Sequence, residues 1–246
     1  MSRVREHYET LLGKVYAWSV SVAGDPLTLA ESWLERHGLL GRDSYLDLGA
    51  GFGAHAQALA RFGKQVTAVD FDATLLEQLS KSLGKLAPRV KVHHGDLLAF
   101  LRGAGVATWD VVLCLGDTIA HLENTGEVEE LIALCVRHLA ARGLLALSYR
   151  DSTMLSAEGV GRFREVARDA SRTMHCLLEP LDEGRLRVTD IVTDIEPDGP
   201  RTRISDYVKL RLAPARVAAW AASKGLTRVG EAEERGMVTQ IFEAVR

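Results

Sequence analysis

The hydrophobic and polar positions of this chain change period along its length. Between residues 41 and 151, short apolar runs alternate with segments whose apolar residues recur at helical spacing. This alternation is typical of a parallel sheet whose buried strands are joined by helices. The predicted strands cover residues 45–48, 65–71, 90–93, 109–115 and 144–149, and the predicted helices cover 54–60, 75–86 and 127–142.

Residues 1–40 form a separate helical region. Their aromatic and apolar positions recur at helical spacing on both sides of a break at Gly24-Asp25-Pro26. Asp25 can cap the second helix, and Pro26 suits its first turn because the missing N–H is not needed there. We therefore expect two helices ahead of the sheet, placed as a lid over its edge. For Tyr8, Tyr16 and Trp18 the alternative to a lid is a place in the core.

After residue 151 the pattern changes to strands joined by tight turns. Strand-like segments are separated by the turn sequences Asp182-Glu183-Gly184 and Pro197-Asp198-Gly199-Pro200. We expect an antiparallel insertion that covers the sheet edge or serves self-association. The prediction is one domain over 1–246, made of a helical lid (1–40), a ligand-binding half (41–151), an antiparallel β insertion after the fifth strand (152–212), and a helix and antiparallel strand pair (213–246) that complete a seven-stranded sheet.

The composition says more about the kind of binding partner than about the fold. The 246 residues carry a formal net charge of -3, without the basic excess expected of a nucleic-acid binder, so a small-molecule partner is favoured. The sequence contains no signal-peptide core and no apolar stretch long enough for a membrane span, so we expect a cytoplasmic location. Cys114, Cys135 and Cys176 are an odd number without metal-ligand spacing and are expected to be reduced thiols.

The first predicted strand ends in a glycine-rich turn. Gly49, Gly51 and Gly53 follow Asp47, and a helix begins at Ala54, so unpaired backbone N–H groups point at whatever lies above the turn. The spacing is G-x-G-x-G, whereas dinucleotide-binding proteins have G-x-G-x-x-G. Asp47 suits a ligand that carries an ammonium group, because a carboxylate repels a pyrophosphate. NAD binding and a purely structural turn remain the alternatives.

Acidic residues close the next two predicted strands. Asp70 ends the second strand, where a carboxylate can accept hydrogen bonds from both hydroxyls of a ribose, and Phe71 follows it. Gly95-Asp96-Leu97 closes the third strand. The adjacent histidines His93-His94 do not indicate a metal site, because neighbouring residues of a strand point to opposite faces. These features support a nucleotide-like ligand and no metal.

The chain resembles the class I S-adenosylmethionine (SAM) methyltransferases, whose first motif is Asp-x-Gly-x-Gly-x-Gly. Within that class it is similar to the glycine and sarcosine N-methyltransferases. The stretch Cys114–Leu122 reads Cys-Leu-Gly-Asp-Thr-Ile-Ala-His-Leu and resembles their Cys-Leu-Gly-Asn-Ser-Phe-Ala-His-Leu. Tyr16-Ala17-Trp18 resembles their Tyr-x-Trp, and Lys209-Leu210-Arg211-Leu212 resembles their Lys-Phe-Arg-Leu.

This resemblance implies a Rossmann-like methyltransferase sheet with helices on both faces. It also implies SAM as the cofactor, S-adenosylhomocysteine as its product, and 41–151 as the SAM-binding half. Trp18 is expected to close over SAM, and an acid at the position of Asp96 is expected to face the adenine. The residues expected to bind the cofactor are Trp18, Asp47, Gly49, Gly51, Gly53, Asp70, Phe71, Gly95, Asp96, Leu97 and Leu115.

The acceptor side carries one departure from that family. Asp117 stands where the family has asparagine, and the added negative charge favours a cationic or amine acceptor, or a role as a base. His121 is the other candidate base, with Tyr149 behind it; a structural role is its alternative. The resemblance implies that Arg150 holds a substrate carboxylate, for which a guanidinium is well suited, whereas an ion pair with Asp151 is the alternative.

The sequence thus predicts a methyltransferase that carries the SAM methyl group to a small-molecule acceptor, at an amine or amino-acid-like nitrogen. The transfer is an in-line displacement at a reactive sulfonium, so aligning the reactants is the main task of the enzyme. The alternatives are methyl transfer to oxygen or carbon, a SAM-binding protein without catalysis, and an NAD-dependent oxidoreductase.

Overall fold

The computed structural model describes residues 3–153, 155, 162–234 and 236–245, and in this part of the chain the strands form two sheets. Sheet A has seven strands in the order β10-β11-β5-β4-β1-β2-β3, which confirms the predicted Rossmann-like sheet. Strands β1 to β5 pair in parallel, whereas β11 is antiparallel to both of its neighbours. The strands are β1 (Ser44–Leu48), β2 (Gln65–Asp70), β3 (Val90–His94), β4 (Trp109–Cys114), β5 (Leu139–Arg150), β10 (Leu226–Glu234) and β11 (Met237–Ala244).

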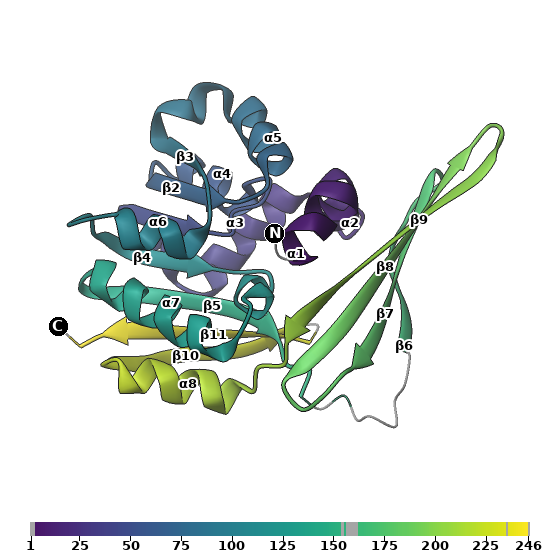
Figure 1. Ribbon diagram of the computed structural model, residues 1–246. Helices are drawn as coiled ribbons and strands as arrows, with labels where there is room; N and C mark the ends of the chain where they lie inside the picture. Colours follow the sequence, from purple (N-terminus) through teal and green to yellow (C-terminus); the bar gives the residue numbers. More distant parts are fainter. Residues whose placement is uncertain (1–2, 154, 156–161, 235, 246) are drawn as a thin grey trace.

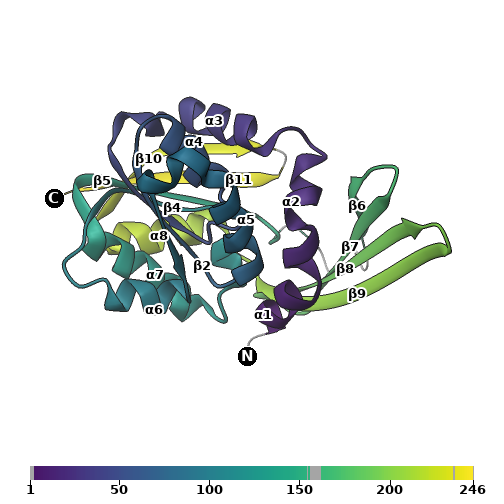
Figure 2. The same ribbon diagram turned by 90° about the horizontal axis from the view of Figure 1, so that it is seen from above.

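Helices cover both faces of sheet A (Figures 1 and 2). Strands β1 and β4 are almost continuously buried, as parallel strands between two helical layers must be. No helix in the described ranges is long and apolar enough to cross a membrane. One face carries α3 (Pro26–Arg36), α4 (Ala54–Arg61) and α5 (Ala73–Leu83), and the other carries α6 (Leu97–Gly103), α7 (Thr125–His138) and α8 (Pro214–Ser223).

Sheet B is the predicted antiparallel insertion and projects to one side of sheet A (Figure 1). Consecutive strands pair along the chain, so each connection is a hairpin. In β8 the even-numbered residues, among them Leu186, Val188 and Val192, are buried on one face, while the alternate residues are more exposed. The strands are β6 (Arg162–Arg168), β7 (Arg172–Pro180), β8 (Arg185–Glu196) and β9 (Gly199–Leu210).

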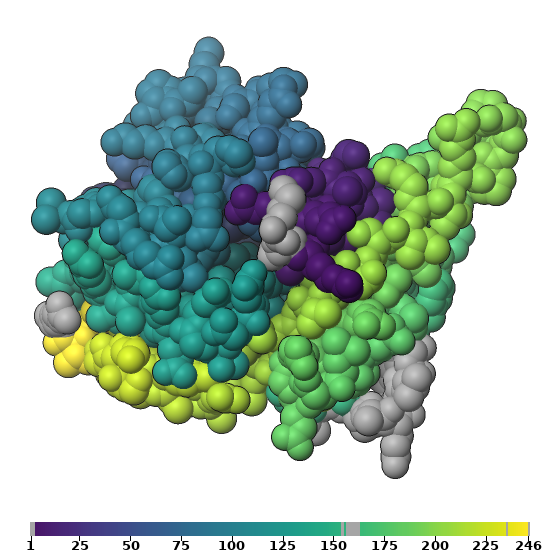
Figure 3. Space-filling model, viewed as in Figure 1, coloured from purple at the N-terminus to yellow at the C-terminus, as the bar shows by residue number. Residues whose placement is uncertain are grey.

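The N-terminal helices fill the space between the two sheets (Figures 2 and 3). They comprise α1 (Arg3–His7), a π-helical turn (Tyr8–Leu12) and α2 (Gly13–Ser21). Leu11, Leu12 and Val15 pack against Met174 and Val192 of the buried face of sheet B. The N-terminal segment and the insertion therefore share one apolar cluster.

The predicted helix start at residue 25 is confirmed, whereas a predicted helix end is wrong. Asp25 accepts a hydrogen bond from the backbone N–H of Thr28 at 3.0 Å. The helix predicted over 127–142 ends at His138 because β5 begins at Leu139, which pairs with β4 ahead of a bulge. The ring of His138 bonds the carbonyls of Ala107 and Leu101, which fixes the chain at this point.

Strand β6 was missing from the sequence prediction. Its residues are mostly charged or exposed, so they do not give an alternating apolar pattern; Phe163 and Val166 are both exposed. The strand forms because it pairs with β7, whose partner β8 is already in place. The predicted insertion boundary at 152 precedes residues 154 and 156–161, which lie outside the described part of the chain.

Gly53 and Gly63 have nearly the same backbone conformation but different surroundings. Substituting each by alanine therefore distinguishes the cost of a steric contact from the cost of a positive φ. Gly53 has φ of 80° and a Cβ there would lie 2.8 Å from Leu79 Cγ, whereas Gly63 has φ of 79° and open space around it on the described surface. Gly63→Ala should cost about 1–2 kcal/mol of unfolding free energy through φ alone. Gly53→Ala should cost about 1–3 kcal/mol more, because Leu79 must move.

Urea unfolding of both variants measures this difference. Equal losses for Gly53→Ala and Gly63→Ala would show that the contact between the glycine turn and Leu79 does not restrict the position.

Candidate active site

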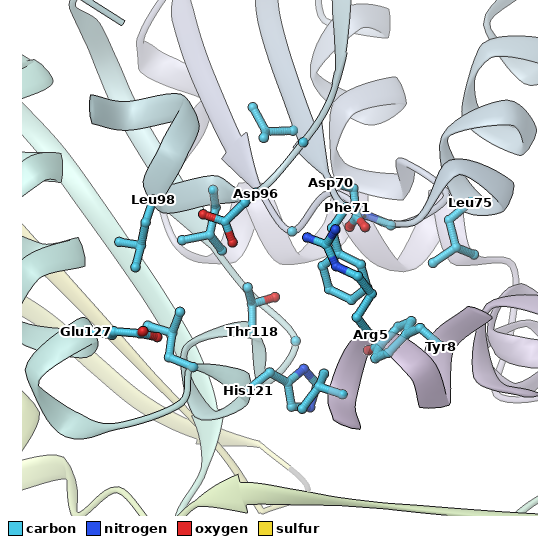
Figure 4. Close-up of a pocket in the computed structure, with 18 of the residues that line it drawn as sticks. Arg5, Tyr8, Asp70, Phe71, Leu75, Asp96, Leu98, Thr118, His121 and Glu127 are labelled. Atoms are coloured by element: carbon cyan, nitrogen blue, oxygen red, sulfur yellow. Dashed lines mark hydrogen bonds between the residues drawn. The ribbon is translucent and has the colours of Figure 1, made fainter. Parts of the chain in front are cut away.

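A pocket opens where β1 to β4 end, next to the N-terminal helices (Figure 4). Its wall combines the loops after these strands with Val4, Arg5, Tyr8 and Tyr16 from the N-terminal segment. This is the sheet edge at which ligands bind in open α/β folds. The predicted cofactor residues that line the pocket are Gly49, Gly51, Asp70, Phe71, Gly95, Asp96, Leu97 and Leu115.

The glycines of the first turn serve different purposes. A Cβ at Gly49 would lie 2.5 Å from Thr118 Oγ1, so that side chain requires a glycine beneath it. At Gly51 the nearest atom would be Tyr16 Cε1 at 3.6 Å, and this glycine faces the pocket. Gly53 packs against α5 and is not among the described residues that line the pocket. Only part of the motif therefore borders the ligand space directly.

Asp70 connects the loops at the pocket floor. Its carboxylate accepts hydrogen bonds from the backbone N–H of Gly51 and of Asp72, each at 2.8 Å. Burial raises the pKa of Asp70 above its usual value, although these hydrogen bonds oppose the rise. Each carboxylate oxygen can accept a further bond, so Asp70 can still hold the hydroxyls of a ribose.

Asp47 lies beneath the glycine turn and is only 3% exposed. Its Oδ2 atom has no hydrogen-bond partner among the described residues, and the side chain is not in the described wall of the pocket. Burial, with a smaller contribution from Asp70, raises the pKa of Asp47 to about 7. Asp47, which was predicted to pair with a ligand ammonium, thus lies beneath the residues that line the pocket.

The third strand brings a further acid to the pocket. The backbone N–H of Gly95 donates to the carbonyl of Asp70 at 2.9 Å, which joins the loops after β2 and β3. Asp96 caps α6 by accepting from the backbone N–H of Ala99 at 2.9 Å. Phe71 presents its ring to Tyr8, with 5.3 Å between the ring centroids. A flat aromatic ligand would find apolar side chains and one acid here.

Asp117 is in an ion pair, which changes the interpretation of its charge. Its Oδ2 atom lies 2.6 Å from Lys209 Nζ, and its Oδ1 atom accepts from the backbone N–H of Arg150 at 2.9 Å. Burial alone would raise the pKa of Asp117, but Lys209, His121 and the hydrogen bonds together hold it below its usual value. Lys209 neutralises the charge of Asp117, so this charge is not available to attract a cation on its own; the role of Asp117 toward an amine acceptor, or as a base, stays a prediction.

His121 lines the pocket across from Asp70 (Figure 4). Its ring lies edge-on to Tyr8 and Tyr207, with centroid distances of 5.9 Å and 5.4 Å. The Nε2 atom is buried and has no hydrogen-bond partner within the described ranges. Burial lowers the pKa of His121 to about 4, although Asp117 opposes this shift. The ring is therefore neutral near pH 7 and can accept a hydrogen bond.

Tyr16 lies where the sequence analysis expected Trp18. A Cβ at Gly51 and one at Gly116 would each be 3.6 Å from the Tyr16 ring or hydroxyl, so Tyr16 spans the pocket between these two loops. Trp18 instead donates from Nε1 to Asp169 Oδ2 at 2.5 Å and faces sheet B. Residues two apart on a helix point in nearly opposite directions. Trp18 is thus outside the described pocket wall.

Two other catalytic candidates also lie outside the described pocket wall. Tyr149 is fully buried in sheet A and donates its hydroxyl to Gln240 Oε1 at 2.8 Å. This hydrogen bond satisfies the buried hydroxyl within the sheet. The position of Tyr149 therefore does not support a catalytic role. Arg150 is exposed at the end of β5, and its backbone N–H donates to Asp117. Its guanidinium is near enough to Tyr16 to oppose the rise that burial causes in the pKa of that phenol.

The sequence analysis expected a helical lid at this edge but did not single out Arg5 or Thr118. Arg5 extends into the pocket, with the guanidinium 5.3 Å from the centroid of Phe71 (Figure 4). Tyr8 and Thr118 also line it. The helical period of 1–40 could have paired Tyr8 with Tyr16, which lie eight positions apart on one face, but nothing in the sequence alone shows which face meets the sheet edge.

Comparisons with known proteins agree with this geometry. Residues 46–143 match the family described as a methyltransferase domain. This match favours SAM over NAD as the ligand of the glycine turn. No curated protein matches the chain in sequence.

Solved structures share the fold over almost the whole chain. The CcbJ methyltransferase from Streptomyces caelestis is 20% identical, with a TM-score of 0.77 and coverage of 92% of each chain. CalS10, an amino pentose methyltransferase from Micromonospora echinaspora, is 20% identical, with a TM-score of 0.76 and coverage of 93% of this chain and 96% of that chain. The sugar N-methyltransferase KedS8 from Streptoalloteichus sp ATCC 53650 is 18% identical, with a TM-score of 0.67 and coverage of 87% of both. The shared fold therefore extends beyond residues 46–143, over almost the whole chain.

The raised pKa of Asp47 predicts how stability depends on pH. Because the folded-state pKa is about 7, above the value near 3.9 in the unfolded chain, the folded protein holds the proton longer. Asp47 therefore destabilises the fold progressively as pH rises from about 4 to about 7, by up to about 1.4 kcal/mol per pH unit, and adds no further loss above that range.

Asp47→Asn removes this titration and should gain stability relative to the wild type over the same range. Urea unfolding of both proteins at several pH values measures the gain. Parallel stability curves would contradict the raised pKa of Asp47.

Proposed function

We propose that the protein transfers the methyl group of SAM to the nitrogen of a small-molecule amine. The observation that carries the proposal is the neutral ring of His121, whose buried Nε2 lacks a partner in the described chain and borders the same pocket as Asp70. Two proteins of similar structure are an amino pentose methyltransferase and a sugar N-methyltransferase, which favours an amino sugar or a related amine as the acceptor.

The donor is proposed to lie across the ends of β1 to β3. Asp70 would accept hydrogen bonds from the ribose hydroxyls, Asp96 would face the adenine amino group, and Phe71 would contact the adenine ring. Gly51 leaves room for the chain that joins ribose and methionine. Asp47 supplies negative potential from below, which favours the ammonium group of the donor.

The acceptor is proposed to bind between His121, Tyr8 and Tyr16. Its nitrogen lone pair attacks the methyl carbon in line with the carbon–sulfur bond, which breaks and leaves S-adenosylhomocysteine. The new ammonium then loses a proton. His121 would accept a hydrogen bond from the attacking N–H group and so direct the lone pair. Alignment of this kind can lower the barrier by about 7–11 kcal/mol.

Glycine and sarcosine are less well supported as acceptors. In the family that the sequence resembles, the position of Trp18 closes over SAM, but here Trp18 faces Asp169. Arg150, expected to grip an acceptor carboxylate, is exposed outside the described pocket wall. We therefore favour an amine without a carboxylate as the acceptor. Amino acids are the comparison acceptors in the activity test below.

Two neighbouring aspartates test the donor site. Asp70→Asn should lower SAM affinity about tenfold or more, because a charge-assisted hydrogen bond contributes about 1.5–3 kcal/mol. Asp72→Asn is the matched control: Asp72 is equally buried but caps α5 through Leu75 and lies outside the described pocket wall. Calorimetric titration with SAM measures both, and equal affinities would remove the ribose role of Asp70.

The reaction is tested by release of S-adenosylhomocysteine with amino sugars, simple amines, glycine and sarcosine. His121→Phe should lower kcat by about tenfold or more while SAM affinity is kept, because phenylalanine keeps an aromatic ring but cannot accept the hydrogen bond from the acceptor amine. For two amines of different pKa, the acidic limb of kcat/KM should follow the amine, since His121 is already neutral. No turnover with any amine, or turnover only with hydroxyl acceptors, would contradict the proposal.

We also propose that two copies of the chain associate through the outer face of sheet B. Phe163 and Ile204 are 57% and 64% exposed, and their register places them on the same face. Exposed apolar groups on one sheet face are typical of an interface. Sedimentation of the wild type and of Ile204→Arg tests this assignment.

A further inference from the structure

Lys209 is a buried lysine contributed by the insertion. It lies on β9, its residue is 5% exposed, and its ammonium is 2.6 Å from the carboxylate of Asp117. An ammonium is costly to bury without an opposite charge, so this contact determines where both side chains lie. The pair joins the insertion to the loop after β4, which lies 92 positions earlier in the chain.

The pair also fixes the turn that carries His121. Asp117 has φ of 78°, a left-handed conformation that is uncommon for a residue other than glycine. Its two carboxylate oxygens bond Lys209 and the backbone N–H of Arg150, and its carbonyl accepts from the N–H of Ala120 at 2.9 Å. The helical turn Thr118–His121 begins immediately afterwards. The backbone N–H of Asp117 also donates to the carbonyl of Ser148 at 3.0 Å, so the strained residue is held by four partners.

The charged and titratable groups around His121 come from each element packed against it. Asp117 lies at the start of its own turn, Lys209 and Tyr207 belong to β9, and Tyr8 belongs to the π-helical turn. His7 of α1 is also nearby, and its ring bonds Asp190 at 3.0 Å and Ser205 at 2.8 Å. Asp117 and Lys209 act on the His121 ring in opposite directions.

We infer that Lys209 is a positioning residue for the methyl transfer: by pairing with Asp117 and holding the turn after it, Lys209 keeps the ring of His121 directed into the pocket and able to accept a hydrogen bond. The role of His121 in the transfer belongs to the proposed function, whereas the coupling between Lys209 and His121 does not depend on it. Without Lys209, the unpaired carboxylate of Asp117 would favour a protonated His121. A protonated ring cannot accept a hydrogen bond from an amine.

An NMR titration tests the coupling directly. The protein is labelled with ¹³C at histidine Cε1, and His121→Gln identifies the resonance of His121. In the wild type this resonance should titrate well below the ordinary histidine value of about 6.5. In Lys209→Met the midpoint should rise by about one pH unit or more. In the double variant Asp117→Asn/Lys209→Met both charges are gone, so the midpoint should return close to that of the wild type.

Two results would overturn the coupling. One is a His121 midpoint near the ordinary histidine value in the wild type. This measurement does not depend on whether any variant folds. The other is an equal shift in the single and double variants, because loss of packing alone would affect both. The double variant also serves if Lys209→Met does not fold, since a neutral pair leaves no buried charge unpaired.

The pH profile of kcat/KM tests the consequence for the reaction. Lys209→Met should show a new acidic limb that follows the shifted His121 midpoint, and the double variant should lose this limb. A shifted His121 resonance without the new limb would overturn the positioning role. Failure of the proposed function is distinct from both results, because it appears as absence of amine turnover in the wild type while the NMR titration is unaffected.

Discussion

Asp70 ties together the three loops on which the pocket depends. Its carboxylate accepts from the backbone N–H of Gly51 and of Asp72, and its carbonyl accepts from the N–H of Gly95. The loops after β1, β2 and β3 are thereby held at one edge of the sheet. The geometry that would let Asp70 bind the proposed ribose is the same geometry that keeps the glycine turn in place, so position alone does not separate the proposed binding role from the structural one.

The parts of the fold set by local patterns could be predicted from the sequence. Buried apolar runs gave strands β1 to β4, and the glycine turn and Asp70 were correctly placed at the sheet edge. The end of the helix at His138 was not predictable, because it depends on carbonyls from Ala107 and Leu101. Strand β6 was not predicted because its sequence has no alternating apolar pattern. It is a strand because it pairs with β7.

The candidate site was harder to predict, because its acceptor side is built from distant segments. The motif around Asp117 indicated an important residue, but its partner Lys209 lies in the insertion, and only the tertiary structure brings them to 2.6 Å. Likewise, Trp18 and Tyr16 belong to one short helix. Which of them enters the pocket follows from the packing of Leu11, Leu12 and Val15 on sheet B. The Tyr-x-Trp motif thus identified the helix that borders the pocket. The packing of the opposite face of this helix on sheet B determines that Tyr16 lines the pocket.

The buried carboxylates at this edge are compensated unequally. Asp117 is neutralised by Lys209, whereas Asp47 and Asp70 face each other's charge, and burial together with this repulsion raises the pKa of Asp47. In the proposed arrangement, SAM would bring a sulfonium and an ammonium to the same edge, so the donor itself would supply the positive charge that these two acids lack. On the proposed acceptor side, the charges of Asp117 and Lys209 already balance each other. Attraction for a cation would then act on the donor, and the nitrogen proposed to attack it would meet a neutral, aromatic environment.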